Sequence, residues 1–136
     1  MHDLFRALLI TFGIPLLFFG WLFYRIMDDG CGHTIYAELA SPDNRYKAIV
    51  FERNCGATTD FSTQISILPM TETLPNESGN IFVIAGHPDV HRVKLKWLSN
   101  TEISIRRKDI GFAVKPEKSV EFIEGIKVSY QVDESE

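Results

Sequence analysis

The chain has 136 residues, room for a single domain, and its 14 basic and 18 acidic side chains give a formal net charge of −4. With Arg6, Arg25 and Asp3 of the apolar N-terminal stretch set aside, the remaining body carries a net charge of about −5. An acidic surface of this kind does not attract phosphate backbones, which argues against nucleic acid as a partner.

The first predicted element is a transmembrane helix over residues 7–24, ALLITFGIPLLFFGWLFY, which contains no charged residue. Eighteen helical residues span roughly 27 Å, close to the hydrocarbon thickness of a bilayer. Arg6 and Arg25 bracket the run, and Trp21 and Tyr24 gather at its far end, where aromatic rings favour the interface. We therefore expect the lipid bilayer to be a partner of this segment.

Three other interpretations of this stretch compete with an anchor over residues 1–27. A cleaved signal peptide has a shorter apolar region and a small-residue site soon after it, whereas Asp28 and Asp29 intervene here. Lipidation at Cys31 requires small or apolar residues before it, which the same aspartates replace. A buried core helix usually has a polar face, and this one has none.

Residues 28–132 are predicted to form one small antiparallel β-sheet or sandwich domain, followed by an acidic tail over residues 133–136. Short runs of alternating apolar and polar residues are separated by turn signals every eight to twelve residues, as in Val93–Trp97. The fold class is thus mainly β, with about seven strands and a further possible one near Ile110–Val114. The seven lie near Thr34–Leu39, Tyr46–Arg53, Thr63–Leu68, Asn80–Ala85, Arg92–Leu98, Glu102–Arg107 and Ile126–Val132.

The first hairpin predicts which residues face each other near the two cysteines. Pro42 and Asp43 favour the central positions of a turn, and Asn44 tolerates left-handed backbone. If Ser41 faces Arg45, the numbers of paired residues sum to eighty-six, and Cys31 then faces Cys55. A one-residue shift or a bulge at the turn would alter this pairing.

A disulfide between Cys31 and Cys55 would close a loop of about 25 residues and stabilise the fold by roughly 3 kcal/mol. Two free thiols that happen to align are the alternative. Disulfides persist in oxidising compartments. The pair therefore predicts that the N-terminus lies inside and that the C-terminal domain lies in a periplasm or outside the cell. The charges that flank the helix barely decide this orientation by themselves.

Two histidines four residues apart, His87 and His91, would suit zinc if they lay on a helix. Pro88 and the neighbouring strand signals argue against a helix, so we expect a turn with two exposed histidines. We accordingly predict neither a metal site nor a cofactor.

A hydroxyl-rich loop follows Cys55 and is the candidate binding loop. Its residues are Thr58, Thr59, Phe61, Ser62 and Gln64. Ser62 or a threonine could act as a nucleophile with His33 as its base, but such a site also needs a third member and an oxyanion hole. We expect these hydroxyls to form hydrogen bonds with backbone groups of the turn, so we assign no catalytic residue.

Residues 31–69 resemble a group of small uncharacterised bacterial membrane-anchored proteins. The resemblance is carried by SPDNRYKAIVF at 41–51, by CGATT at 55–59, by FSTQ at 61–64 and by Cys31-Gly32. Asn44 and Asp60 stand where the group tends to have glycine, and both residue types tolerate left-handed backbone. The resemblance implies a membrane segment before the motif but no activity.

Together these features predict a membrane-tethered, non-enzymatic binding or scaffold domain in the bacterial envelope. It would act on an envelope protein partner through its sheet edges or the candidate binding loop. One alternative is an immunity or inhibitor protein that neutralises an envelope toxin, which its small size, acidity and tether would suit. A small hydrolase is a further alternative.

Overall fold

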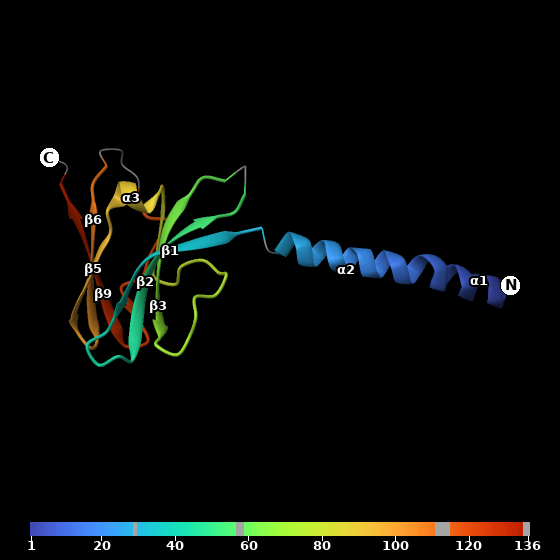
Figure 1. Ribbon diagram of the computed structural model, residues 1–136, viewed down its shortest axis with the longest axis horizontal. Coiled ribbons are helices and arrows are strands. Elements are labelled where there is room, and N and C mark those ends of the chain that lie inside the picture. The colour runs from blue at the N-terminus through green and yellow to red at the C-terminus, as the bar shows by residue number, and fades with distance from the viewer. Residues whose placement is uncertain (29, 57–58, 111–114, 135–136) are drawn as a thin grey trace. The chain divides into compact units, whose positions relative to one another are not determined.

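A computed structural model describes residues 1–28, 30–56, 59–110 and 115–134 of the chain. The protein is mainly β with one N-terminal apolar helix, as the sequence predicts (Figure 1). The chain divides into two compact units, Met1–Cys31 and Gly32–Glu136, which are considered separately below.

The N-terminal helix changes its backbone pattern once along its length. It comprises α1 (His2–Leu8), a π-helical turn η1 (Leu9–Gly13) and α2 (Ile14–Asp28). The π turn ends two residues before Pro15, which has no N–H and crowds the carbonyl of the preceding turn, so the backbone ladder shifts there. Within the described residues this is one helix, His2–Arg25, long and apolar enough to cross a membrane, and none of it is buried.

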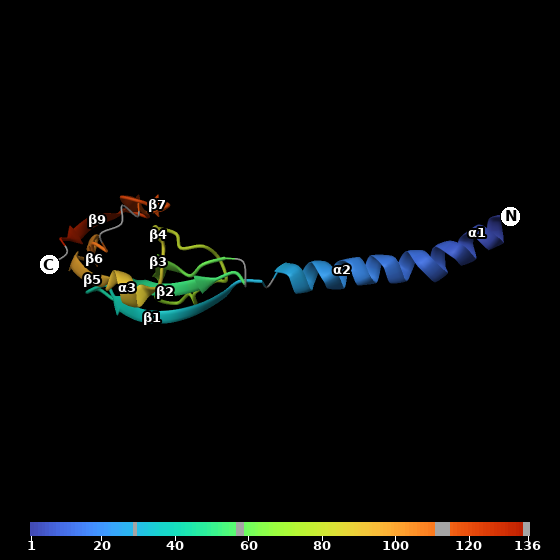
Figure 2. The same ribbon diagram turned by 90° about the horizontal axis from the view of Figure 1, so that it is seen from above.

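The second unit is built from two sheets. The five-stranded sheet has the order β1 (Gly32–Ala40), β2 (Tyr46–Asn54), β3 (Ser62–Pro69), β4 (Phe82–Ala85) and β7 (Lys118–Ser119). The four-stranded sheet has the order β5 (Lys94–Ser99), β6 (Glu102–Lys108), β9 (Ile126–Asp133) and β8 (Phe122–Ile123). Figure 2 shows the first sheet curving from β1 to β7, with β5, β6 and β9 across from it.

All seven predicted strands are present. The two-residue strands β7 and β8 were not predicted from the sequence. Pairing is antiparallel except between β6 and β9, which run parallel. β6 and β9 are not joined by a hairpin, because β7 and β8 lie between them in the chain. The possible strand at Ile110–Val114 falls almost wholly outside the described residues, and β9 extends one residue into the predicted tail.

The main core lies between the sheets, where the inward positions of each strand meet. On β2 the side chains of Ala48 and Val50 enter this core, while Ile49 and Phe51 enter a smaller cluster on the opposite face, covered by Leu74. The alternation of strand side chains explains this division, and it leaves β2 buried on both faces. The other buried members of the main core are Ile65, Ile67, Ile81, Phe82, Ile84, Ile103, Ile105, Ile126 and Val128.

At one side of the domain the outermost strands β1 and β5 approach without pairing. The indole Nε1 of Trp97 donates to the carbonyl oxygen of Leu39 at 3.0 Å and joins the two sheets at one end of this seam. The short helix α3 (Pro88–His91) contacts β2, β3 and β6 and lies at the other end. Among the described residues, Trp97 therefore joins β1 to β5 at one point of the seam, and the two strands do not pair with each other.

The expected turn with two exposed histidines is wrong. Residues 88–91 form one helical turn, because Pro88 occupies its first position and the side chain of His87 accepts from the Asp89 amide as N-cap. The turn ends at Arg92, whose φ of 45° is left-handed, and β5 begins only at Lys94. His91 is fully buried rather than exposed.

The two cysteines form the predicted disulfide, Cys31–Cys55. The neighbouring pair Gly32 and Asn54 sums to eighty-six, as the count from the turn required. However, Ser41 pairs with Tyr46, donating its N–H to that carbonyl oxygen at 2.8 Å, so the register at the turn is shifted by one. A β-bulge at Tyr36 restores the count before the chain reaches the cysteines.

Candidate functional site

The predicted binding loop does not form one surface. Thr58 lies outside the described residues, and the hydroxyl of Thr59 donates to the Gly56 carbonyl at 3.2 Å, satisfying the turn. Phe61 is 46% exposed, while Gln64 is buried. Only part of the loop is therefore available to a partner.

Gln64 and Ser62 are structural within this loop. The Gln64 carbonyl oxygen accepts the amide of Gly79 at 2.7 Å, and its amide donates to the Ser62 hydroxyl at 2.8 Å. Ser62 in turn donates to the Arg53 carbonyl oxygen at 3.3 Å. These bonds hold the loop at residues 70–79 against β3 rather than leaving free groups for a ligand.

The structure does not bring His33 and Ser62 together. Both residues pair with Arg53, His33 from β1 and Ser62 from β3, so β2 lies between them. Two strand spacings amount to about 10 Å, which is beyond the reach of direct proton transfer. The hydrolase alternative therefore gains no support from these residues.

His87 and His91 do not converge on a common point. The Nε2 atom of His91 lies 2.7 Å from the Ala85 carbonyl oxygen inside the domain, whereas His87 faces a different set of side chains at the surface. Among the described residues, no group of three His, Cys, Asp or Glu side chains is arranged to hold a metal ion.

His87 is the centre of a cluster that the sequence did not reveal. Its Nε2 atom lies 2.9 Å from the Tyr36 hydroxyl and 2.7 Å from Oε2 of Glu52, while Nδ1 lies 3.3 Å from Oδ2 of Asp89. Phe61 meets the imidazole edge to face at 5.8 Å. The cluster thus joins β1, β2, the segment before β3 and the start of α3. We call it the His87 cluster.

The two ring nitrogens of His87 have different neighbours. The Asp89 amide donates to Nδ1 at 3.3 Å, whereas Nε2 lies against the Tyr36 hydroxyl and the Glu52 carboxylate. Oε2 of Glu52 is buried and lies 2.7 Å from Nε2 of His87, so the imidazole covers this carboxylate oxygen.

The neighbours of Tyr36 change the pKa of its hydroxyl. Partial burial of its hydroxyl, followed by the negative charges of Glu52 and Asp89 and a hydrogen bond to Glu52, raises the pKa of Tyr36 above its usual 10.0. The bulge places Tyr36 as the extra residue of β1, opposite no partner on β2. It is this irregularity, rather than strand alternation, that directs the ring toward His87.

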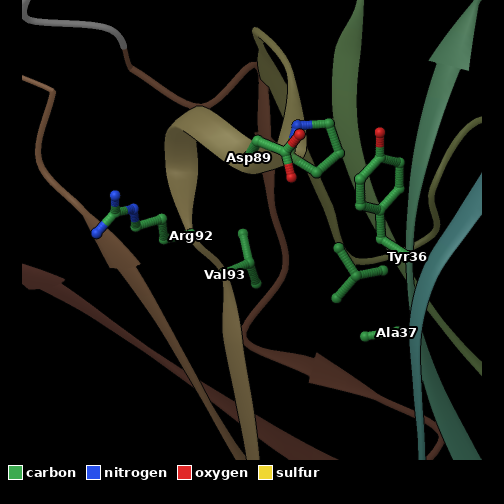
Figure 3. Close-up of a pocket in the computed structure, with 7 residues that line it drawn as sticks. Tyr36, Ala37, Asp89, Arg92 and Val93 are labelled. Carbon is green, nitrogen blue, oxygen red and sulfur yellow. The ribbon is translucent and has the colours of Figure 1, made fainter.

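A cleft of about 460 Å³ lies beside the His87 cluster, in the seam between β1 and β5. Its apolar lining consists of Ala37, Val50, Pro88 and Val93, with Tyr36 on one side (Figure 3). Asp89 and Arg92 supply its charged rim. The cleft therefore combines apolar and polar surface in similar amounts.

Arg92 forms part of the rim, but its charge lies outside the cleft. Its guanidinium makes no ion pair or hydrogen bond with any residue that the structure describes, and Asp89, three residues earlier, is instead in contact with His87. Figure 3 shows the guanidinium directed away from Tyr36, Ala37 and Asp89.

The chain matches no protein-family model, and no curated protein or solved structure is significantly similar to it.

The residues of the cleft escaped sequence analysis because they come from three separate segments. The nearest local signal is the spacing of His87 and Asp89, which fits an N-cap followed by an acidic first turn. Nothing local links that pair to Tyr36 or Glu52.

Proposed function

We propose that the chain is a single-pass envelope protein whose β domain is a non-enzymatic binding module for an envelope protein partner. The apolar helix would anchor it in the bacterial inner membrane, with its N-terminus inside. The disulfide supports an oxidising compartment, the periplasm or the cell exterior, for the domain. The unburied apolar surface of His2–Arg25 supports the anchor, because water would not tolerate it.

The cleft between β1 and β5 is the observation that carries this proposal. It combines apolar side chains with Asp89 at its rim, and it lies beside the open outer edge of β1. The His87 cluster stiffens one side of it by linking the β1 bulge to α3. This arrangement supports recognition better than it supports bond-breaking chemistry.

Topology is tested by labelling intact cells with a membrane-impermeant maleimide. We expect Cys31 and Cys55 to label from outside the cytoplasm only after a reductant opens the disulfide. Labelling that requires lysis of the inner membrane would overturn the proposed localisation.

Binding at the cleft is tested with a photo-crosslinking amino acid at Val93. Ala37→Phe fills the cleft, while Ala40→Phe adds the same side chain to the same exposed strand outside it. We expect a crosslinked envelope protein in the parent chain and in Ala40→Phe, and its loss in Ala37→Phe. An equal yield in all three would show that the cleft is not the site.

A further inference from the structure

The outer edge of β1 is an open hydrogen-bonding edge. β1 ends the order of its sheet, all nine of its residues are exposed, and it contains no proline. Natural edge strands are usually short or protected by lysine, proline or a covering segment. The edge of β5 follows that rule with Lys94 and Lys96, whereas β1 presents Ile35, Tyr36 and Leu39.

The hydrogen-bond pattern of the first hairpin shows which amide points outward. Ser41 donates its N–H to Tyr46, and the register continues unbroken from there back to Ala37. Since bonded and non-bonded pairs alternate in an antiparallel ladder, Glu38 and its partner Ile49 form a non-bonded pair. The N–H and C=O of Glu38 therefore face the outer edge, toward the seam.

We propose that this edge accepts an extended strand of another polypeptide, in which apolar and acidic residues alternate. The inference deepens the proposed function, on which it rests, by naming the chemistry of the partner. Main-chain hydrogen bonds to the outer edge of β1 would supply affinity, and alternate side chains would supply specificity.

The two faces of the added strand would meet different surroundings. Its inward side chains would enter the cleft against Ala37, Val50 and Val93. Its outward side chains would lie beside the exposed Lys94 and Lys96 of β5. This basic border favours carboxylates and disfavours a basic strand.

A second copy of this chain is a poorer occupant of the same edge. Its own β1, GHTIYAELA, carries one carboxylate, Glu38, and that side chain already contacts Lys47 at 3.4 Å. Pairing of β1 with itself would therefore leave the basic border without a counterpart.

The test uses the full chain in detergent micelles and an eight-residue capped peptide that alternates valine and glutamate. Amide hydrogen exchange should show protection at Glu38 on addition of the peptide. A valine–lysine peptide should bind at least about tenfold more weakly, a change of about 1.4 kcal/mol. A valine–glutamate peptide with N-methylated amides on one edge keeps its side chains but not its hydrogen bonds, and it should lose binding.

Two variants of one residue isolate the main-chain contribution. Glu38→Pro removes the outward N–H, which an edge strand tolerates, and it should weaken binding by at least about tenfold. Glu38→Ala removes the same side chain but retains the N–H, and its affinity should stay within about threefold of the parent. Lys96→Glu should weaken binding of the acidic peptide and favour the basic one.

Equal binding of the N-methylated and parent peptides, or of Glu38→Pro and Glu38→Ala, would overturn the proposal, as would pairing of two copies through β1. The N-methylated peptide decides the matter even if Glu38→Pro does not fold. Failure of all peptides, with the Val93 crosslink still abolished by Ala37→Phe, would reject strand addition while leaving the binding module in place. If no peptide binds and Ala37→Phe also leaves the Val93 crosslink unchanged, both strand addition and the binding module are rejected.

Discussion

The hydroxyl of Tyr36 lies 2.9 Å from Nε2 of His87, although fifty-one residues separate them in the chain. The contact joins the bulge of β1 to the N-cap of α3, and the two rings meet edge to face at 5.4 Å. It therefore couples one side of the cleft to the segment that leads into β5.

His87→Ala should lower the free energy of unfolding by about 1–3 kcal/mol, because it leaves the largely buried Glu52 carboxylate without its imidazole neighbour. Chemical denaturation at neutral pH measures the change. In a Glu52→Gln background the same substitution should be about 1 kcal/mol milder, since no charge remains to be stranded. An identical effect in both backgrounds would mean that the two side chains are not coupled.

Gly86→Ala should destabilise the domain by about 1–3 kcal/mol, for two reasons. The φ of Gly86 is +109°, which side chains of L-residues rarely adopt, and an added Cβ would lie 2.8 Å from Nε2 of the buried His91. Gly32→Ala is the matched control, because nothing lies within 4 Å of its Cβ position. It should stay within about 0.5 kcal/mol of the parent. Similar thermal unfolding of the two variants would contradict this account.

Replacing both cysteines by serine should lower the free energy of unfolding by roughly 3 kcal/mol, the chain-entropy value for a loop of about 25 residues. Reductant should destabilise the parent chain by a similar amount and leave the double variant unchanged. A parent protein indifferent to reductant would show that the Cys31–Cys55 bond contributes little to the fold.

Tyr130→Phe should cost about 1 kcal/mol at neutral pH, because the Tyr130 hydroxyl lies 2.7 Å from the Val120 carbonyl oxygen and 3.0 Å from that of Ile81. Burial, outweighing the hydrogen bond to Val120, raises the pKa of Tyr130 from 10.0 to about 12.

A raised pKa means that this contribution to stability is complete below pH 10, the value in the unfolded chain, and is lost as the pH rises through about 12. The difference in stability between parent and Tyr130→Phe should therefore shrink over that interval. Denaturation curves at pH 9, 10, 11 and 12 measure it. A difference that stays constant would show that Tyr130 ionises alike in both states.

Local patterns in the sequence determined most of the β scaffold. Alternation assigned all seven longer strands, because a strand with one face in a core repeats every second residue. The turn at Ser41 was also local, and Asn44 takes the expected left-handed backbone, with φ of 56°. Counting from that turn correctly predicted the disulfide, but only because two unpredicted features cancel. The register at Ser41 is shifted by one residue, and the bulge at Tyr36 shifts it back.

Tertiary structure alone decided the candidate site. Whether Gln64 faces a ligand or the Gly79 amide, and whether His91 is exposed or buried, depends on which distant segments pack over them. The same holds for Tyr36, Glu52 and His87, which meet only when β1, β2 and the start of α3 are in place. Periodicity records which side of an element is apolar, because burial acts on each residue separately. It does not record which residues meet across a seam, because that depends on the three-dimensional positions of segments far apart in the chain.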